Sequence, residues 1–267
     1  SNKGLLISID QDSTAIEYSK KRLEKFGSKW KVFKGNFENI DTIAYMAGVD
    51  KVDGILMDIG VSSKQLDDPE RGFSYRYDVK LDMRMNTEQK ISAYDIVNTY
   101  TEEQLSKIIF EYGEERHARK IAKLIVEERK SSPIEKTSDL ITLIKRAYPE
   151  RASKHPAKKT FQAIRIEVNR ELEVLENAIS KAAELLKVGG RLAIITFHSL
   201  EDRIVKNKFK DLATACKCPK DIPICVCGGV KKFEIITKKP IIPIDNELKN
   251  NNRAHSSKLR ILERILD

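Results

Sequence analysis

Short apolar runs alternate with an amphipathic segment near the start of the chain. Residues 5–10, 30–35 and 52–58 are mostly apolar and are bounded by polar residues, so each run is predicted to form a buried strand. Residues 13–26 carry apolar side chains at helical spacing among charged ones, which predicts an amphipathic helix. This order of strand, helix, strand and strand favours βαβ units and a parallel sheet.

The hydrophobic pattern changes after about residue 62 and stays helical to about residue 153, with no convincing strand. Thr101 and Gln104 have the spacing of a capping box that starts a helix. Residues 114–129 and 137–147 show further helical periodicity. We therefore expect a helical insertion in the α/β unit.

The strongest helical signal lies in residues 160–187, where apolar residues recur every three or four positions. It predicts a single helix of roughly 40 Å that ends at Val188, Gly189 and Gly190. Residues 191–196 are then predicted to return to the sheet as a strand. Residues 233–237 and 259–263 are two further candidate strands, which we expect to pair at the sheet's edge.

Composition narrows the class of protein. Among 267 residues, 49 Lys and Arg outweigh 40 Asp and Glu, and the net charge of +9 suits a polyanionic partner. No apolar run approaches the ~20 residues that a membrane span needs, so no membrane partner is expected. Four cysteines are too few for a disulfide scaffold, and no secretory signal opens the chain, so a cytoplasmic protein is expected.

Three predicted strands end in polar residues, Asp10, Asp58 and His198, at the edge where open parallel sheets bind ligands. A carboxylate such as that of Asp10 can accept hydrogen bonds from both ribose hydroxyls of an adenosine cofactor. A helix N-cap or a solvated strand end explains Asp10 equally well. Phe37 either lies against an adenine ring or belongs to the core. Residues 58–63 place an acid, a glycine and two hydroxyls where a strand meets a loop, which fits either a ligand site or an ordinary turn.

A long charged loop follows, and it contains Arg71 and Arg84, which are suited to binding phosphate or stacking on a base. Basic residues also recur farther along the chain, where they indicate either a solvated face or a nucleic-acid surface. These residues are Arg151, Lys154, His155, Lys158, Lys159, Lys231, Lys232, Lys238, Lys239, Arg253, Lys258 and Arg260.

The cysteines form a paired C-x-C pattern made of Cys216, Cys218, Cys225 and Cys227. Four thiolates can bind zinc, but the spacing is tighter than in the usual zinc ribbon, so the sequence does not predict a metal. Buried thiols and a labile disulfide remain alternatives.

Several motifs occur together along nearly the whole chain. They are residues 58–63, 65–67, 71–74, 81–85, 112–116, 155–157, 160–166, 168–169, 196–203 and 256–260. With these motifs the sequence closely resembles the RsmH (MraW) family of bacterial S-adenosylmethionine-dependent small-subunit rRNA cytosine-N4 methyltransferases.

The resemblance implies an α/β fold, with a class I (Rossmann-like) methyltransferase sheet and an all-helical insertion domain between its fourth and fifth strands. We expect residues 1–68 and 159–267 to form the methyltransferase domain, and residues 69–158 to form the insertion that recognises RNA. The family's first strand and glycine-rich loop have no counterpart here, because the chain starts after them, and they are expected to be absent. The implied localisation is cytoplasmic.

The resemblance also implies site residues and partners. The cofactor would be S-adenosyl-L-methionine, held by Asp10, Phe37, Asp58 and Gln65. The candidate catalytic residues are Asp58, Ser62, Ser63 and His198, with no metal at the site. The candidate RNA-binding residues are Arg71, Arg84, Lys154, Lys158, Lys159, Lys258 and Arg260. The substrate would be a cytidine in the decoding region of 16S rRNA within the small ribosomal subunit, and the protein would be a monomer or homodimer that does not bind DNA.

Three other functions are compatible with parts of the pattern. A nicotinamide oxidoreductase shares the βαβ unit with a terminal acid, but the chain has no signature of its substrate domain. A DNA cytosine-N4 methyltransferase would carry a Pro-Pro-aromatic motif where this chain has Ile59, Gly60 and Val61. A non-catalytic RNA-binding factor of ribosome assembly on the same fold is the remaining alternative.

Overall fold

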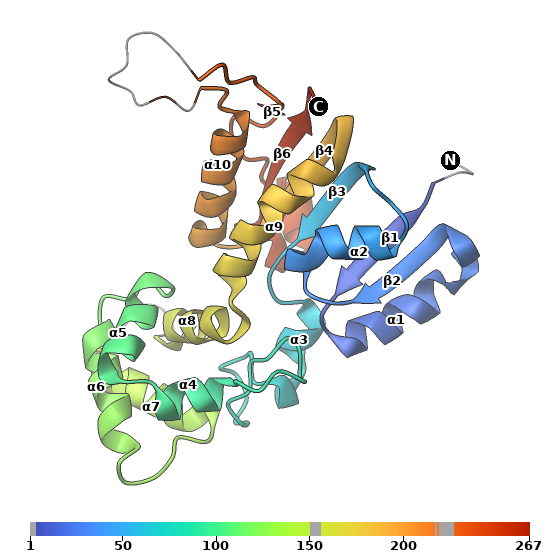
Figure 1. Ribbon diagram of the computed structural model, residues 1–267. Coiled ribbons are helices and arrows are strands. Elements are labelled where there is room, and N and C mark those ends of the chain that lie inside the picture. Colours follow the sequence, from blue (N-terminus) through green and yellow to red (C-terminus); the bar gives the residue numbers. More distant parts are fainter. Residues whose placement is uncertain (1–3, 150–155, 217, 219–226) are drawn as a thin grey trace. The chain divides into compact units, whose positions relative to one another are not determined.

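The computed structural model describes residues 4–149, 156–216, 218 and 227–267 (Figure 1). The chain divides into two compact units. Unit 1 contains Ser1–Gly60 and Leu172–Asp267, and unit 2 contains Val61–Glu171.

Unit 1 is built on strands that form two sheets (Figure 1). In the first sheet, β1 (Leu6–Asp10) pairs in parallel with β2 (Trp30–Lys34). They are connected by α1 (Ser13–Leu23), whose N-cap is Asp12, and a 3-10 helix (Glu24–Lys29). The parallel βαβ unit predicted from the sequence is confirmed.

The second sheet of unit 1 has the order β3-β4-β6-β5. Its strands are β3 (Val52–Asp58), β4 (Leu186–Thr196), β5 (Phe233–Ile235) and β6 (Lys258–Arg264). β3 and β4 are parallel, and β6 runs antiparallel to both β4 and β5. The two predicted C-terminal strands therefore do pair, but only β5 lies at the edge.

Helices and short turns complete unit 1. They are η2 (Phe37–Asn39), α2 (Ile40–Met46), α9 (Glu171–Leu185, which starts one residue before the unit), α10 (Ser199–Ala213), α11 (Asp245–Asn250) and η4 (Asn252–Ser256). Apolar residues of α9 and α10 pack with those of the four-stranded sheet into one core, which includes Ile179, Ile194, Val205, Phe209 and Leu262. This packing holds the carboxyl ends of β3 and β4 in place.

Unit 2 is helical in its described residues, as predicted for the middle of the chain. It contains α3 (Ser63–Asp67), η3 (Pro69–Arg71), α4 (Ala93–Thr99), α5 (Glu102–Glu111), α6 (Ala118–Glu128), α7 (Thr137–Ala147) and α8 (Ala157–Asn169). The predicted capping box of Thr101 and Gln104 is present. Unit 2 includes more residues than the expected 69–158 insertion. Residues on both sides of that range pack in its core, namely Phe161, Ile164 and Val168 of α8 and the partly buried Val61 and Leu66.

The predicted single helix over residues 160–187 is wrong. Arg170 has a φ of 50° and separates α8 from α9. Nε and Nη2 of Arg165 bind the two carboxylate oxygens of Glu171 at 2.8 and 2.9 Å. Residues six apart lie on different faces of a continuous helix, so this ion pair depends on the break. The apolar periodicity continues in phase across Arg170, where no glycine or proline marks the break.

The end of that segment also differs from the prediction. β4 begins at Leu186 and contains Val188, Gly189 and Gly190, which were expected to end the helix. The pairing register shifts between Val52 and Gly54 opposite this segment, so it forms an irregular start to the strand. Across the described part of the chain, no helix is both long and apolar enough to cross a membrane.

Candidate active site

Two of the predicted site residues end parallel strands of unit 1. Asp10 is the last residue of β1, and Asp58 is the last residue of β3. Both acids therefore lie at carboxyl ends of strands. Figure 1 shows β1 and β3 pointing in the same direction. Open parallel sheets bind their ligands at such ends.

The carboxyl groups of Asp10 and Asp58 both have a raised pKa. Crowding at the strand ends partly desolvates both carboxyls and raises the pKa of Asp10 and of Asp58, although both side chains remain open to solvent. For Asp10, a hydrogen bond from the Asp12 N–H at 2.8 Å to Oδ1 opposes this shift. The N-cap of α1 is Asp12, so the N-cap alternative for Asp10 is wrong.

A glycine turn follows Asp58 and is supported by a buried acid. Gly60 has a φ of +97°, a conformation that side-chain-bearing residues rarely adopt. A Cβ at this position would lie 3.7 Å from Phe197 and 3.8 Å from Oε1 of Glu201. The ends of β3 and β4 are therefore tied to the start of α10 through Glu201, which is only 2% exposed.

His198 lies at this junction as the N-cap of α10. Oε2 of Glu201 accepts the N–H of Phe197 at 2.7 Å and that of His198 at 3.2 Å. Nδ1 of His198 accepts the Glu201 N–H at 3.5 Å, and Nε2 lies 3.1 Å from Oε1 of Glu201. Despite this proximity, Nε2 is buried and has no hydrogen-bond partner among the described residues. This geometry favours a positioning role for His198 over that of a catalytic base.

Ser62, Ser63 and Gln65 belong to unit 2, where they start α3. The Ser62 Oγ accepts the Gln65 N–H at 3.2 Å, and Oε1 of Gln65 accepts the Ser62 N–H at 2.9 Å. This reciprocal pair is a capping box. Ser63 is the exposed first residue of the helix. The amide of Gln65 thus has a structural role in capping α3.

Phe37 begins η2 just after β2 and packs, half-buried, against the core of unit 1. The core alternative for this residue is therefore supported. A partly exposed ring at this position still has a surface on which an adenine can stack.

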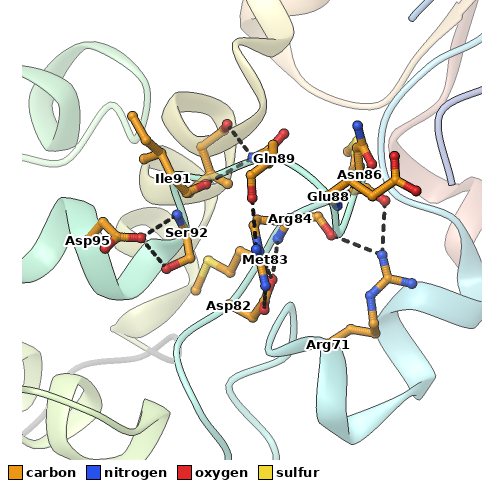
Figure 2. A network of polar contacts seen from close by, with 12 residues as sticks. Arg71, Asp82, Met83, Arg84, Asn86, Glu88, Gln89, Ile91, Ser92 and Asp95 are labelled. Carbon is orange, nitrogen blue, oxygen red and sulfur yellow. Dashed lines mark hydrogen bonds and ion pairs between the residues drawn. The ribbon is translucent and has the colours of Figure 1, made fainter. Parts of the chain in front are cut away.

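The long charged loop of unit 2 is held by its own arginines (Figure 2). Nη2 of Arg71 donates to the carbonyl oxygens of Arg84 and Met85 at 2.9 and 3.1 Å. The Arg84 guanidinium binds both carboxylate oxygens of Asp82, with Nε–Oδ1 at 2.9 Å and Nη2–Oδ2 at 2.7 Å. Its Nη1 donates to the carbonyl of Gln89 at 2.8 Å. Both predicted RNA-binding arginines are therefore engaged within the protein.

The same loop carries backbone strain at Met83, which is fully buried with a φ of 59°. A left-handed conformation costs a residue with a side chain roughly 1–2 kcal/mol. Asn169 offsets this cost, because its Nδ2 donates to the Met83 carbonyl and its Oδ1 accepts the Met85 N–H, both at 2.8 Å. Asn169 is itself 7% exposed, so it fixes the loop from the end of α8.

We expect Asn169→Ala to lower the free energy of unfolding by about 2–4 kcal/mol, because it leaves a buried N–H and a buried carbonyl without partners. Urea unfolding followed by circular dichroism measures this change. Asn86→Ala is the matched control. Among the described residues its Oδ1 accepts only an exposed bond, from Glu88 N–H in the same loop, so a loss of about 1 kcal/mol or less is expected. Equal effects of the two substitutions would contradict the assigned role of Asn169.

The remaining predicted RNA-binding residues divide into three groups. Arg260 and Lys258 both contact the Asp202 carboxylate, so their charges have internal partners. Lys159 Nζ donates to the carbonyl of Glu114 at 2.6 Å, and Lys158 is exposed. Lys154 lies outside the described residues.

The residues that organise the site were not predicted from the sequence. Glu201 is the third residue of α10, and the His198-x-x-Glu201 spacing is a capping-box signal that could have identified it. Asn169 and Asp202 carry no comparable local signal, because their partners are far away in the sequence.

The fold defines an α/β protein with acidic residues at the carboxyl ends of its parallel strands, where such sheets typically bind ligands, and with a helical unit between β3 and β4 in the sequence. The chain belongs to the MraW methylase family, whose model matches residues 1–265.

Its relatives include proteins named "Ribosomal RNA small subunit methyltransferase H". The relative from Fusobacterium nucleatum subsp. nucleatum is 96% identical over 267 residues, which are 100% of this chain and 85% of that protein. The relative from Clostridioides difficile is 54% identical over 268 residues, covering 99% and 86% of the two chains. The relative from Caldicellulosiruptor bescii is 53% identical over 266 residues, with coverages of 99% and 86%.

Proposed function

We propose that this protein transfers a methyl group from S-adenosyl-L-methionine to the exocyclic N4 amine of a cytidine in the decoding region of 16S rRNA. The observation that carries the proposal is the Asp58 carboxylate, which ends β3 beside the Gly60 turn. Within the described part of the chain, no hydrogen bond or ion pair occupies this carboxylate. It is therefore available to a ligand.

The residues at the strand ends fit the proposed cofactor. The exposed Asp10 carboxylate suits the two ribose hydroxyls, and the half-buried Phe37 ring suits the adenine. When bound, the cofactor supplies an electrophilic methyl group on a positively charged sulfur.

The chemistry expected of this protein is to orient the cytosine amine and to accept charge from it. The nitrogen lone pair is delocalised into the ring, so the amine is a weak nucleophile. Alignment of the amine at ~3–3.5 Å from the methyl group removes much of the entropic barrier. A carboxylate that accepts an N–H of the amine stabilises the positive charge that develops on nitrogen.

We assign this acceptor role to Asp58, because its carboxylate is open and the Gly60 turn next to it allows close approach. Ser62 and Ser63 remain candidates for a hydroxyl contact with the base, because both are exposed at the start of α3. His198 is assigned a supporting role, since it and Glu201 fix the turn between β4 and α10.

RNA binding is proposed to rest on the net charge of +9 rather than on Arg71, Arg84 or Arg260, whose charges serve the fold. Exposed Lys158 is the best supported of the predicted phosphate contacts. Phosphate contacts release counterions, so affinity for small-subunit RNA is expected to fall steeply as salt rises. The target base would have to leave its stack to reach a strand-end pocket.

The test uses the full-length protein, immature small ribosomal subunits and a cofactor with an isotopically labelled methyl group. Nucleosides from the digested 16S rRNA are then separated and identified by mass spectrometry. The proposal expects the label in N4-methylcytidine. Label on a ribose, on another base or on a protein would overturn it, and salt-sensitive RNA binding without any label would favour the assembly-factor alternative.

Cofactor binding is expected to depend on pH through Asp10. Partial desolvation raises the pKa of Asp10, so its carboxylate is protonated at a higher pH than in a free chain. A protonated carboxyl loses acceptor capacity, and cofactor affinity should therefore fall as the pH drops through this raised pKa. Isothermal titration calorimetry of the full-length protein over a pH series measures it. Asp10→Asn should bind weakly with a flatter profile, and identical profiles would exclude this role.

A further inference from the structure

Three cysteines of unit 1 gather together, away from the strand-end acids along the chain. In the sequence they lie between the end of α10 and the start of β5. The Sγ atoms of Cys216, Cys218 and Cys227 all lie within 4.8 Å of one another, and those of Cys216 and Cys227 are 3.9 Å apart. Cys225 lies outside the described residues. The sequence pattern alone did not predict a metal here, and the side-chain geometry changes that conclusion.

We propose that Cys216, Cys218 and Cys227 bind a structural Zn²⁺ ion. In a tetrahedral zinc site with Zn–S bonds of about 2.3 Å, two sulfur atoms lie about 3.8 Å apart. The distance of 3.9 Å between Cys216 and Cys227 matches this value. A disulfide would need about 2.05 Å, so these two sulfurs are not bonded to each other.

The backbone brings the residues next to Cys216 and Cys227 together. Gly228, with a φ of +58°, directly follows Cys227. At Gly229, a Cβ would lie 1.8 Å from the carbonyl oxygen of Ala215, so only glycine allows this close approach. Ala215 directly precedes Cys216. These two segments therefore meet where the thiols are, and two glycines make this possible.

Exposure also favours a bound metal. Cys216 and Cys227 are exposed and Cys218 is half-buried, so none of the three serves as a core side chain. Exposed thiols are prone to oxidation, which makes a cluster of them costly without a ligand. Thiolates are soft ligands that select zinc over magnesium or calcium. Each thiol that binds loses its proton to solvent as the Zn–S bond forms.

The ion would also support one wall of a pocket. Cys227, Gly229 and Val230 line a pocket of about 530 Å³ together with residues of α9 and α10. A metal bridge between the two segments would hold this wall of the pocket and the start of β5 in place.

The test begins with the metal content of the full-length protein, purified without chelators from zinc-supplemented cells. Inductively coupled plasma mass spectrometry should find about one zinc ion per chain, as expected for a single site. Cys216→Ser and Cys227→Ser should each lose most of it. Ser180→Ala, which changes another residue lining the same pocket, should retain it.

A second measurement does not depend on the folding of the variants. Cobalt added to the metal-free parental protein should give the intense visible bands of tetrahedral thiolate coordination, and zinc should displace them. Zinc should also slow alkylation of the cysteines by N-ethylmaleimide at least tenfold. A zinc content near zero without cobalt bands, iron in place of zinc, or a mass that shows a disulfide between the cysteines would each overturn the proposal.

Discussion

Asp202→Ala is expected to lower the free energy of unfolding by about 3–5 kcal/mol, because it leaves a buried guanidinium without its counterion. Asp202 on α10 accepts hydrogen bonds from Arg260 on β6, with Nε–Oδ1 at 2.7 Å and Nη2–Oδ2 at 3.2 Å. The Arg260 side chain is 8% exposed and that of Asp202 is 14% exposed. Lys258 adds a second cation at 3.3 Å.

The control and the pH dependence distinguish this ion pair from a general effect of substitution on α10. Asp211→Ala removes an exposed carboxylate from the same helix and should change stability by no more than about 0.5 kcal/mol. Burial alone would raise the pKa of Asp202, but Arg260 and Lys258 outweigh it and hold the pKa below its usual value.

The sign of the pH effect follows from that lowered pKa. The stabilisation is fully present above the pKa of an unfolded aspartate and is lost as pH falls through the lowered pKa of the folded state. The difference between parent and Asp202→Ala should therefore shrink in acid. Urea unfolding at several pH values measures it, and a constant difference would show that Asp202 acts through packing instead.

Asp58→Asn is expected to lower the rate of methyl transfer about a hundredfold to ten-thousandfold, the usual range for a lost proton acceptor. The substitution keeps the shape of the side chain but removes the charge that would stabilise the developing positive nitrogen. Single-turnover transfer of labelled methyl to small subunits measures the rate. Transfer at the parental rate would remove Asp58 from the mechanism.

The free energy of unfolding and a control substitution at a second aspartate distinguish a loss of catalysis from misfolding. Partial desolvation raises the pKa of Asp58, so the folded state disfavours its charged form, and the neutral amide should leave stability unchanged or slightly higher. Asp53→Asn is the control on the same strand, because the Asp53 carboxylate forms an exposed pair with Lys187 at 2.9 Å. It should retain the parental rate.

Local patterns predicted most of the secondary structure. The strands ending at Asp10 and Asp58 follow from short apolar runs bounded by polar residues, and α7 follows from its apolar spacing. The capping box of Thr101 is a signal over four residues. These features depend on neighbours in the chain, so the sequence contains what is needed to predict them.

Features that depend on distant partners were not predicted. The break at Arg170 lies within an unbroken apolar period and is stabilised by Arg165, Glu171 and the contacts of Asn169 with residues 83–85. Arg71 and Arg260 were predicted to bind RNA because the sequence shows their charge but not their distant partners. The position of β6 between β4 and β5 likewise depends on pairing across the sheet.

By itself, the sequence determined the α/β pattern, the acids at the strand ends and the family resemblance, because each is carried by residue types at short spacings. Only the tertiary structure decided which charges are neutralised internally, that Glu201 supports the Gly60 turn, and that three cysteine sulfurs meet at metal-binding distance. The physical reason is that hydrogen bonds, ion pairs and metal ligation act over a few ångströms. Folding alone brings distant residues that close.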